Sequence, residues 1–339
     1  MMESSGVTRR FGRWQRVALA IATIGVLTAG CSNGSGGGTG STERVTIAGG
    51  DQVGAAQFLV AEAQQLWTAE SLEAARQSFP SGRDALNALI GGQAQFATIG
   101  DLPTVTAVLS GRKLNIVANL SWGVSWRLLT TTSSGVNAFP DLRGKRIGVT
   151  EGTNTQYLLS KVLADGGLTP SDVTVVNLAA SQIPASLSAG DIDAGFTFPS
   201  FYAATKKALG PRYRELVYPG YQSPTLLVAR TDVSDAQISK VLTVLNRAQK
   251  VVDDDPAKAR ADVVAASNNT LTADNVNELW PLYQVKLGLD VPLRDALVAE
   301  AEWATTSLPI TVTGRPADLA ASLYPAPLRS VSPGLVSLP

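Results

Sequence analysis

The sequence predicts an α/β protein of two lobes, between which the chain crosses twice. Three observations support this fold class. Residues 141–202 alternate short apolar strands with amphipathic helices, and residues 45–131 repeat that alternation. A returning strand near residue 226 is then followed by a mostly helical tail. Because strands that alternate with helices build sheets covered by helices, each of the two runs is expected to form a sheet of its own.

The second run has the clearest pattern. Residues 145–149 alternate charged and apolar side chains, as a short buried strand does. The turn at 151–155 opens a helix that Gly166 and Gly167 end, and Gly190 ends a second helix in the same way. The expected order is strand, helix, strand, helix, strand, with the strands at 145–149, 173–178 and 194–198. A parallel sheet flanked by helices follows.

The first run begins after residue 44. Its expected strands lie at 45–48, 96–99 and 114–120, with a weaker one at 72–79 and a crossing segment at 128–131. Three helices are expected in this run. The first carries Phe58 to Trp67, the second begins at Ser81, and the third begins at 100–104, where Pro103 suits a first helical turn.

The tail predicts a strand at 226–229 and helices at 238–252, 256–267, 272–286 and 292–307. The run of carboxylates at 253–255 is interpreted as a solvated turn that caps a helix and not as a metal site. Crossings are placed near 130–134 and 221–225. Lobe 1 is therefore expected to comprise 44–131 and 225–339, and lobe 2 to comprise 132–224. Two crossings predict a hinge, with a ligand cleft at the carboxyl ends of the strands.

The first 43 residues indicate export. Four arginines precede the apolar run 17–29, which is too short to span a bilayer but suits a signal peptide over residues 1–30. Residues 27–31 resemble a bacterial lipobox that ends in Cys31, the single cysteine of the chain. We therefore expect Cys31 to carry a lipid anchor, followed by a flexible Gly/Ser tether over 31–43. A twin-arginine signal at Arg9 and Arg10 is a weaker alternative, because Gly12 breaks its pattern.

Composition excludes several classes of function. Removal of residues 1–30 takes away four arginines and Glu3, which leaves 24 basic and 27 acidic residues and a net charge of −3. No basic patch emerges, so nucleic acid is not an expected partner. The chain has no histidine, which excludes His-based triads and imidazole metal sites. No phosphate-binding loop, CxxC or GxSxG motif is present. We expect no catalytic residue, no metal and no cofactor.

The turn at 151–155 carries the most specific chemistry in these residues. It places glycine, hydroxyl groups and unpaired N–H groups at a helix N-terminus, where an anion binds without any lysine or arginine. The alternative is that Thr153 or Asn154 only caps its own helix, as these residue types usually do. The turn by itself favours the capping role.

Several motifs together resemble the type II periplasmic binding proteins of ABC importers. The resemblance is to the branch that binds alkanesulfonates, taurine, nitrate and thiamine-precursor pyrimidines. It covers residues 45–333, nearly the whole chain after the tether. The order and spacing of short motifs carry it, at 81–82, 84–89, 92–97, 100–101, 141–149, 152–153, 168–173, 190–194 and 328–333.

The resemblance implies a set of ligand-contacting turns. Carried over position by position, the ligand-binding residues are Gly50, Asp51, Gln52, Ser81, Gly82, Asp101, Trp122, Gly152, Thr153, Asn154, Thr155 and Phe198. Relatives often have Trp-Asp-Pro-Tyr where this chain has Phe-Pro-Ser-Phe at 198–201. The aromatic residue is kept and the carboxylate is lost, so the pocket of one particular sulfonate does not transfer directly.

Two of these positions, and the neighbouring Trp126, have an equally ordinary structural interpretation. Trp122 suits a pocket wall or simple packing, and Trp126 is expected to pack in the core, because two residues four apart in a turn seldom both point inward. Asp101 suits a ligand ammonium group, but an aspartate before Leu-Pro is more often an N-cap. With the resemblance added, Thr153, Asn154 and Thr155 become the preferred anion contacts.

The resemblance implies a solute-binding lipoprotein on the outer face of the cell membrane, or in the periplasm of a host with two membranes. It is expected to be a monomer that closes on a small organic anion and presents it to an ABC permease with its ATPase. A sulfonate is the first choice of ligand. Nitrate- or bicarbonate-type anions, a thiamine-precursor pyrimidine, and a sensor that does not transport are the alternatives. Enzymes of this fold that form pyrimidines use their own histidine, which this chain lacks.

Overall fold

The computed structural model describes residues 42–124 and 126–338. The expected signal peptide, Cys31 and residues 31–41 of the tether lie outside this part of the chain. The described residues belong to one folded unit that contains two mixed sheets, one of six strands and one of five. In the described residues, no helix combines the length and the hydropathy that a membrane crossing requires.

The larger sheet has the strand order β11-β4-β10-β3-β1-β2. Strand β1 is parallel to β2 and β3, whereas β10 is antiparallel to β3 and β4, and β11 is antiparallel to β4. All four strands expected in the first run form, including the weak one. The strands are β1 Glu43–Ala48, β2 Leu72–Gln77, β3 Phe96–Gly100, β4 Asn115–Gly123, β10 Ser223–Ala229 and β11 Tyr283–Gly288.

The smaller sheet has the order β7-β6-β8-β5-β9. Strand β6 is parallel to β7 and β8, which confirms the parallel unit expected in residues 141–202. Strand β5 is antiparallel to β8 and β9, so the complete sheet is mixed. The strands are β5 Trp126–Thr131, β6 Arg146–Val149, β7 Thr174–Asn177, β8 Ala194–Gly195 and β9 Tyr213–Tyr218.

The chain passes between the sheets earlier than the sequence predicts. Strand β5 pairs with β9 along its whole length, from Trp126 opposite Tyr218 to Thr131 opposite Tyr213. The first crossing therefore lies between β4 and β5, and not at 130–134, where a run of threonine and serine after β5 forms a turn. The second crossing lies between β9 and β10, where it was expected.

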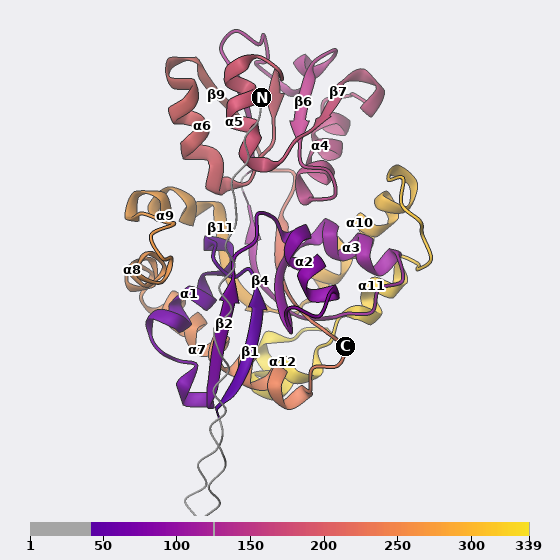
Figure 1. The fold of residues 1–339 in the computed structure, drawn as a ribbon. Helices are drawn as coiled ribbons and strands as arrows, with labels where there is room; N and C mark the ends of the chain where they lie inside the picture. Colours follow the sequence, from indigo (N-terminus) through magenta and orange to yellow (C-terminus); the bar gives the residue numbers. More distant parts are fainter. Residues whose placement is uncertain (1–41, 125, 339) are drawn as a thin grey trace, which may run out of the picture. The chain divides into compact units, whose positions relative to one another are not determined.

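Helices cover both faces of the larger sheet. Helices α1, α7 and α8 pack together on one side, and α2, α3, α10 and α11 lie on the other (Figure 1). Helices α4, α5 and α6 accompany the smaller sheet. Their bounds are α1 Ala56–Ala63, α2 Gly82–Ile90, α3 Asp101–Leu109, α4 Asn154–Asp165, α5 Ile183–Ala189, α6 Tyr202–Leu209, α7 Asp235–Asp254, α8 Pro256–Ala266, α9 Ala273–Leu279, α10 Val291–Ser307, α11 Ala317–Ser322 and α12 Ala326–Val331.

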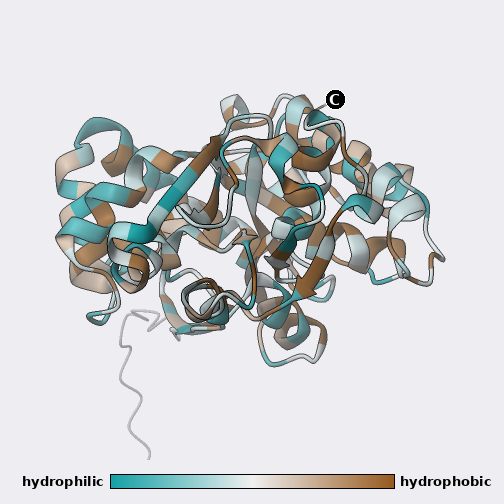
Figure 2. Ribbon diagram, turned by 90° about the horizontal axis from the view of Figure 1, so that it is seen from above, coloured by the Kyte–Doolittle hydropathy of each residue, from teal (hydrophilic) through white to brown (hydrophobic). Residues whose placement is uncertain are grey.

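The hydrophobic core follows from the central position of β3 and β10. Every residue of β10 is buried, as is nearly every residue of β3, because helices cover both faces of these strands. Apolar residues accordingly concentrate on the inner strands, and hydrophilic residues on the outer helices (Figure 2). The core fixes the strand ends and helix starts from which the functional site is built.

One expected helix is wrong. Residues 272–286 contain the short helix α9, which ends at Leu279, and residues from Tyr283 onward form strand β11. Pro281 explains the break, because proline removes a helical N–H and its ring clashes with the preceding turn. The apolar residues Tyr283, Val285 and Leu287 alternate with exposed Gln284 and Lys286, which is the period of a strand.

Candidate functional site

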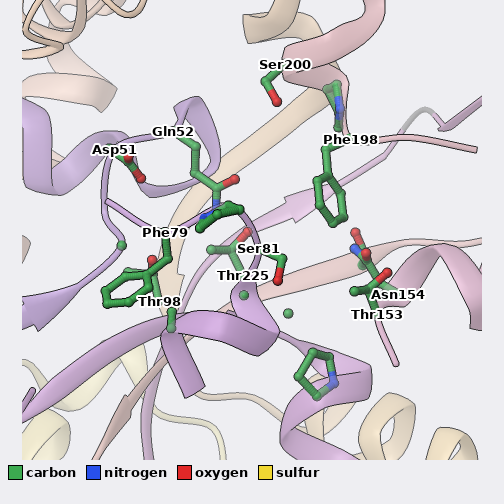
Figure 3. Close-up of a pocket in the computed structure, with 18 of the residues that line it drawn as sticks. Asp51, Gln52, Phe79, Ser81, Thr98, Thr153, Asn154, Phe198, Ser200 and Thr225 are labelled. Carbon is green, nitrogen blue, oxygen red and sulfur yellow. The ribbon is translucent and has the colours of Figure 1, made fainter. Parts of the chain in front are cut away.

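A cavity of about 310 Å³ lies among loops that follow strands of both sheets. Figure 3 shows Asn154 and Phe198 on one side of it, facing Gln52, Phe79 and Ser81 on the other. Segments far apart in the sequence meet here, at 49–52, 79–85, 98–103, 153–154, 198–201, 223–225, 270–271 and 283, together with Trp126.

Two helix N-termini face this cavity, one from each sheet. Helix α2 begins at Gly82, after the Ser81 side chain has capped it by accepting from the amide of Asp84 at 3.2 Å. Helix α4 begins at Asn154, after Thr153. The first amides of a helix have no partner within the helix and carry partial positive charge. The described lining residues include no lysine or arginine, and Asp51 is the only one with a formal charge. The cavity therefore suits an anion held by neutral donors.

The turn before α4 is tightly bonded to itself. The Thr153 hydroxyl donates to the carbonyl of Thr150 at 2.7 Å, and the hydroxyl oxygens of Thr153 and Thr155 lie 2.9 Å apart. The side chain of Thr155 is fully buried and does not line the cavity. Capping and anion binding are thus compatible here: the threonines build the turn, and Asn154 presents its amide to the cavity (Figure 3).

The neighbouring N-terminal turns are close together. A Cβ atom on Gly82 would lie 3.1 Å from the amide nitrogen of Gly100, which caps α3. Glycine at residue 82 lets the two backbones approach, so that the start of α3 stands beside the start of α2. Gly100 and Pro103 of this third turn also line the cavity.

The turn after β1 is held by Thr98. The amide of Gly50 donates to the Thr98 hydroxyl at 2.8 Å, and Gly49 has a φ of +89°, which favours glycine. A Cβ on Gly49 would lie 2.3 Å from that hydroxyl oxygen. Gly50 therefore shapes the turn that presents Asp51 and Gln52 to the cavity, and it does not line the cavity itself.

Aromatic rings form the rest of the wall. Tyr283 lies in β11 of the larger sheet, and Phe79 follows β2 of the same sheet. Trp126 lies in β5 of the smaller sheet, and Phe198 and Phe201 follow its strand β8. Trp126 packs in the core as expected, with its ring stacked on Tyr221 at a centroid distance of 6.1 Å, and it also lines the cavity. Its indole Nε1 is buried and donates to no described residue. The two tryptophans do not share one turn, because Trp122 belongs to β4 and Trp126 belongs to β5.

The cavity brings together seven of the twelve predicted positions: Asp51, Gln52, Ser81, Gly82, Thr153, Asn154 and Phe198. Gly152 lies behind the wall, where its amide donates to the Gln156 side chain at 2.8 Å. Gly50 and Thr155 support turns, as described above. Asp101 and Trp122 line a second cavity instead. Sequence reasoning missed Thr98, Ser223 and Thr225, which were visible as hydroxyl residues in otherwise apolar strands.

Asp101 does not have the capping role that its sequence context favours. Gly100 is the N-cap of α3, and Asp101 is the first helical residue, with its Oδ1 accepting from the adjacent amide of Leu102 at 3.0 Å. Its other oxygen accepts from the hydroxyl of Tyr221. The expected cap at Asp255 does form, since its side chain accepts from the amide of Lys258 at 2.9 Å.

Comparison with known proteins identifies the relatives of this chain. The sequence model of the family described as NMT1/THI5 like matches residues 52–259. A Brucella abortus (strain 2308) protein that is named as a binding protein is 26% identical over 251 residues, which cover 68% of this chain and 77% of that protein. The taurine-binding periplasmic protein of Escherichia coli (strain K12) is 30% identical over 132 residues, which cover 39% of this chain and 41% of that protein.

Solved structures show the same fold. The alkanesulfonate-binding protein SsuA from Xanthomonas axonopodis pv. citri, bound to MOPS, superposes with a TM-score of 0.70 at 20% identity, over 85% of this chain and 100% of that one. The desulfurization enzyme DszB superposes with a TM-score of 0.62 at 14% identity, over 85% of this chain and 98% of that one. The fold is that of a type II periplasmic binding protein, and by its sequence the chain belongs to the NMT1/THI5 like family.

Proposed function

We propose that this protein is the extracytoplasmic solute-binding component of an ABC importer and that it captures a small organic anion, with a sulfonate as the first choice. The observation that carries the proposal is the cavity in which the N-termini of α2 and α4 face a space without a lining cation. Amides at helix N-termini bind oxyanions. Relatives named for taurine and alkanesulfonate binding support the choice of ligand.

The aromatic wall favours an organic anion over an inorganic one. Trp126 and Phe198 lie in or directly after strands of the smaller sheet, and Phe79 and Tyr283 lie in or directly after strands of the larger one. Rings of this kind cover an alkyl or aryl group and leave its charged end to the polar donors. Nitrate or bicarbonate has no apolar part and would leave these rings without a partner.

Closure of two lobes is the proposed mechanism. We assign residues 42–124 and 223–338 to one lobe and residues 126–218 to the other, which moves β5 from the first lobe of the sequence prediction to the second. Each lobe contributes one of the two helix N-termini, so bringing the lobes together completes the donor set and excludes water. The segments between β4 and β5 and between β9 and β10 act as the hinge.

The remaining features of the proposal rest on the sequence and on the relatives. We assign residues 1–30 to a signal peptide and Cys31 to lipid attachment, which tethers the mature protein to the outer face of the membrane. There the protein, as a monomer, meets a permease and its ATPase. A binding role without catalysis is favoured by the relatives named for binding and by the absence of histidine from the sequence.

Isothermal titration of the purified protein with propanesulfonate, taurine, nitrate, bicarbonate, sulfate and an aminopyrimidine tests the ligand class. We expect a sulfonate to bind and Asn154→Asp to weaken its binding at least about tenfold, because a new carboxylate would face the anion. This variant should fold well, since a negative charge at a helix N-terminus is favourable. Asn137→Asp makes the same change on an exposed loop of the same lobe and should leave binding unchanged. Binding of the pyrimidine alone would overturn the sulfonate assignment.

A further inference from the structure

A second cavity, of about 430 Å³, adjoins the first, and Pro224 lines both. Its walls come from α3 and α10 on the larger sheet, from α4 on the smaller one, and from the second crossing at 220–222. Gln222 and Gln284 on its rim are exposed, so the cavity is open to solvent.

Two buried carboxyl groups face this second cavity. The exposed fractions of Asp101 and Glu300 are 2% and 1%. The hydroxyl of Tyr221 donates to Asp101, whereas Oε1 of Glu300 has no hydrogen-bond partner among the described residues. Neither carboxylate forms an ion pair within the described part of the chain. A buried charge without an ion pair is costly, so a buried pair of carboxyl groups without one requires a reason.

The pair retains negative charge near neutral pH. Burial raises the pKa of Asp101 to about 6, and the hydrogen bond from Tyr221 opposes this rise. Burial raises the pKa of Glu300 well above its usual range, and the nearby charge of Asp101 raises it further. Asp101 is therefore the first of the two to ionise, and the pair presents a negative charge to the cavity once pH rises through about 6.

Aromatic rings complete the walls. Tyr157 and Tyr221 stand edge to face, with their ring centroids 5.4 Å apart, and Trp122 lines the same space. Lys161 is the one cation among the described lining residues, and its Nζ lies over the ring of Tyr157, 5.2 Å from the centroid. The position of this ammonium group shows that the rings already accept a cation.

We propose that the second cavity is a binding site for a small organic ammonium ion, separate from the anion site. Its ammonium group donates to Asp101 and to the unpartnered oxygen of Glu300, and its carbon atoms pack on Trp122 and the two tyrosines. The volume is in the range of small-molecule sites. A metal ion is a poorer fit, because the described residues contain no group of three side chains able to ligate one.

Binding of the ammonium ion should strengthen as pH rises. A bound cation favours the ionised carboxylates over the protonated ones, so affinity is expected to increase from pH 5 to pH 7. Tyr157 and Tyr221, which face the pair, stay neutral over this range because burial raises the pKa of each. Lys161 and Asp290 are the other ionisable groups among the described lining residues.

Titration with butylammonium, with butan-1-ol as the neutral control, tests the proposal on the full protein. We expect butylammonium to bind and butanol not to bind. Asp101→Asn, which removes the carboxylate of the pair that ionises first, should lower the affinity at least tenfold, and Glu302→Gln, which removes an exposed carboxylate from helix α10, should leave it unaltered. A cooperative thermal unfolding transition of Asp101→Asn shows that the variant is folded. If that variant does not fold, Trp122→Leu serves instead and should lower the affinity severalfold.

Three results would overturn the proposal. Equal binding of butylammonium and butanol would show that only apolar contact matters. Equal binding of butylammonium by wild type and Asp101→Asn would exclude the carboxyl pair. Binding that appears only in Lys161→Met would show that Lys161 of this chain fills the site. A protein that binds no sulfonate can still be tested with butylammonium, with butanol and with both variants. Failure of the proposed function and failure of this proposal can therefore be told apart.

Discussion

The guanidinium of Arg83 donates through Nη1 to the carbonyl of Glu151 at 2.6 Å, and this hydrogen bond joins helix α2 to the turn before helix α4. The two N-termini that face the anion cavity are thus linked directly. The guanidinium also lies against Gly152, where a Cβ atom would be 3.2 Å from Nη1. Glycine at residue 152, expected in the sequence analysis to contact the ligand, instead makes room for this link.

Arg83→Met should weaken sulfonate binding about two- to fivefold, because the hydrogen bond stabilises the arrangement in which both turns face the ligand. The side chain is exposed, so only a small effect on unfolding is expected. Titration calorimetry measures the affinity, with Arg112→Met, exposed on the same lobe, as the control. A variant with wild-type affinity would show that the link has no part in binding.

Gly82→Ala should lower ligand affinity about three- to tenfold with little change in melting temperature. Its methyl group would press on the amide of Gly100 at 3.1 Å and move two N-terminal turns apart, and contacts this close require the neighbours to shift. Gly334→Ala places a methyl group in open space and should change nothing. Unaltered binding by both variants would contradict the role of the close approach.

Thr155→Val should destabilise the protein by about 1–2 kcal/mol, because it leaves the buried amide of Thr150, now 3.2 Å from the Thr155 hydroxyl, without its partner. Affinity should change less than about twofold, since the side chain does not line the cavity. Urea unfolding measures the first quantity and calorimetry the second. Thr174→Val on the exposed strand β7 is the matched control. A large loss of affinity at unchanged stability would restore Thr155 as a ligand contact.

The free energy of unfolding should fall as pH rises from about 4 to 7. Since burial raises the pKa of Asp101 to about 6, the folded protein holds this proton more tightly than the unfolded chain does. The resulting stability is complete below about pH 4 and is lost through pH 6, by up to about 3 kcal/mol. The sequence has no histidine to add a transition in this range.

Urea unfolding at a series of pH values checks this effect, with Asp101→Asn as the variant. The amide cannot ionise, so the decline between pH 4 and 7 should become shallower. A profile that is the same in the variant and in the wild type would assign the decline to other groups.

Cys31→Ser should move the protein from the membrane fraction to the soluble fraction, because a serine cannot carry the thioether-linked lipid. Fractionation of cells that express each form, followed by immunoblotting, measures this shift. Continued membrane association of the variant would contradict lipid attachment at this residue.

The sequence predicts most of the α/β framework because local signals mark it. Gly166 and Gly190 end helices where expected, and Pro103 and Ser81 mark helix starts. Strand β11 escaped prediction because the segment follows a helix without a glycine, although Pro281 marks the break. The position of Trp126 in β5 depends on pairing with β9, where it stands opposite Tyr218, just over ninety residues away along the chain, and no local pattern contains that information.

The residues of the candidate site also fall into two groups, those that local patterns predict and those that they do not. Turns at helix N-termini are local features, so Ser81, Gly82, Thr153 and Asn154 were found from their own surroundings. Thr98, Thr225 and Tyr283 line the cavity because distant strands meet there. Asp101 shows the limit most clearly: its neighbours favour a cap, and its actual partner is Tyr221, 120 residues away along the chain.

Pro224 lines both cavities, and a dye placed beside it would turn the protein into an optical reporter. A dye attached through a cysteine at Gln222, exposed two residues from that wall, would sit at the second crossing and clear of the anion turns. The only native thiol is Cys31, so labelling of a Cys31→Ser background would be confined to one position. Fluorescence from that single dye would then report when the lobes move, without touching the molecule that moves them.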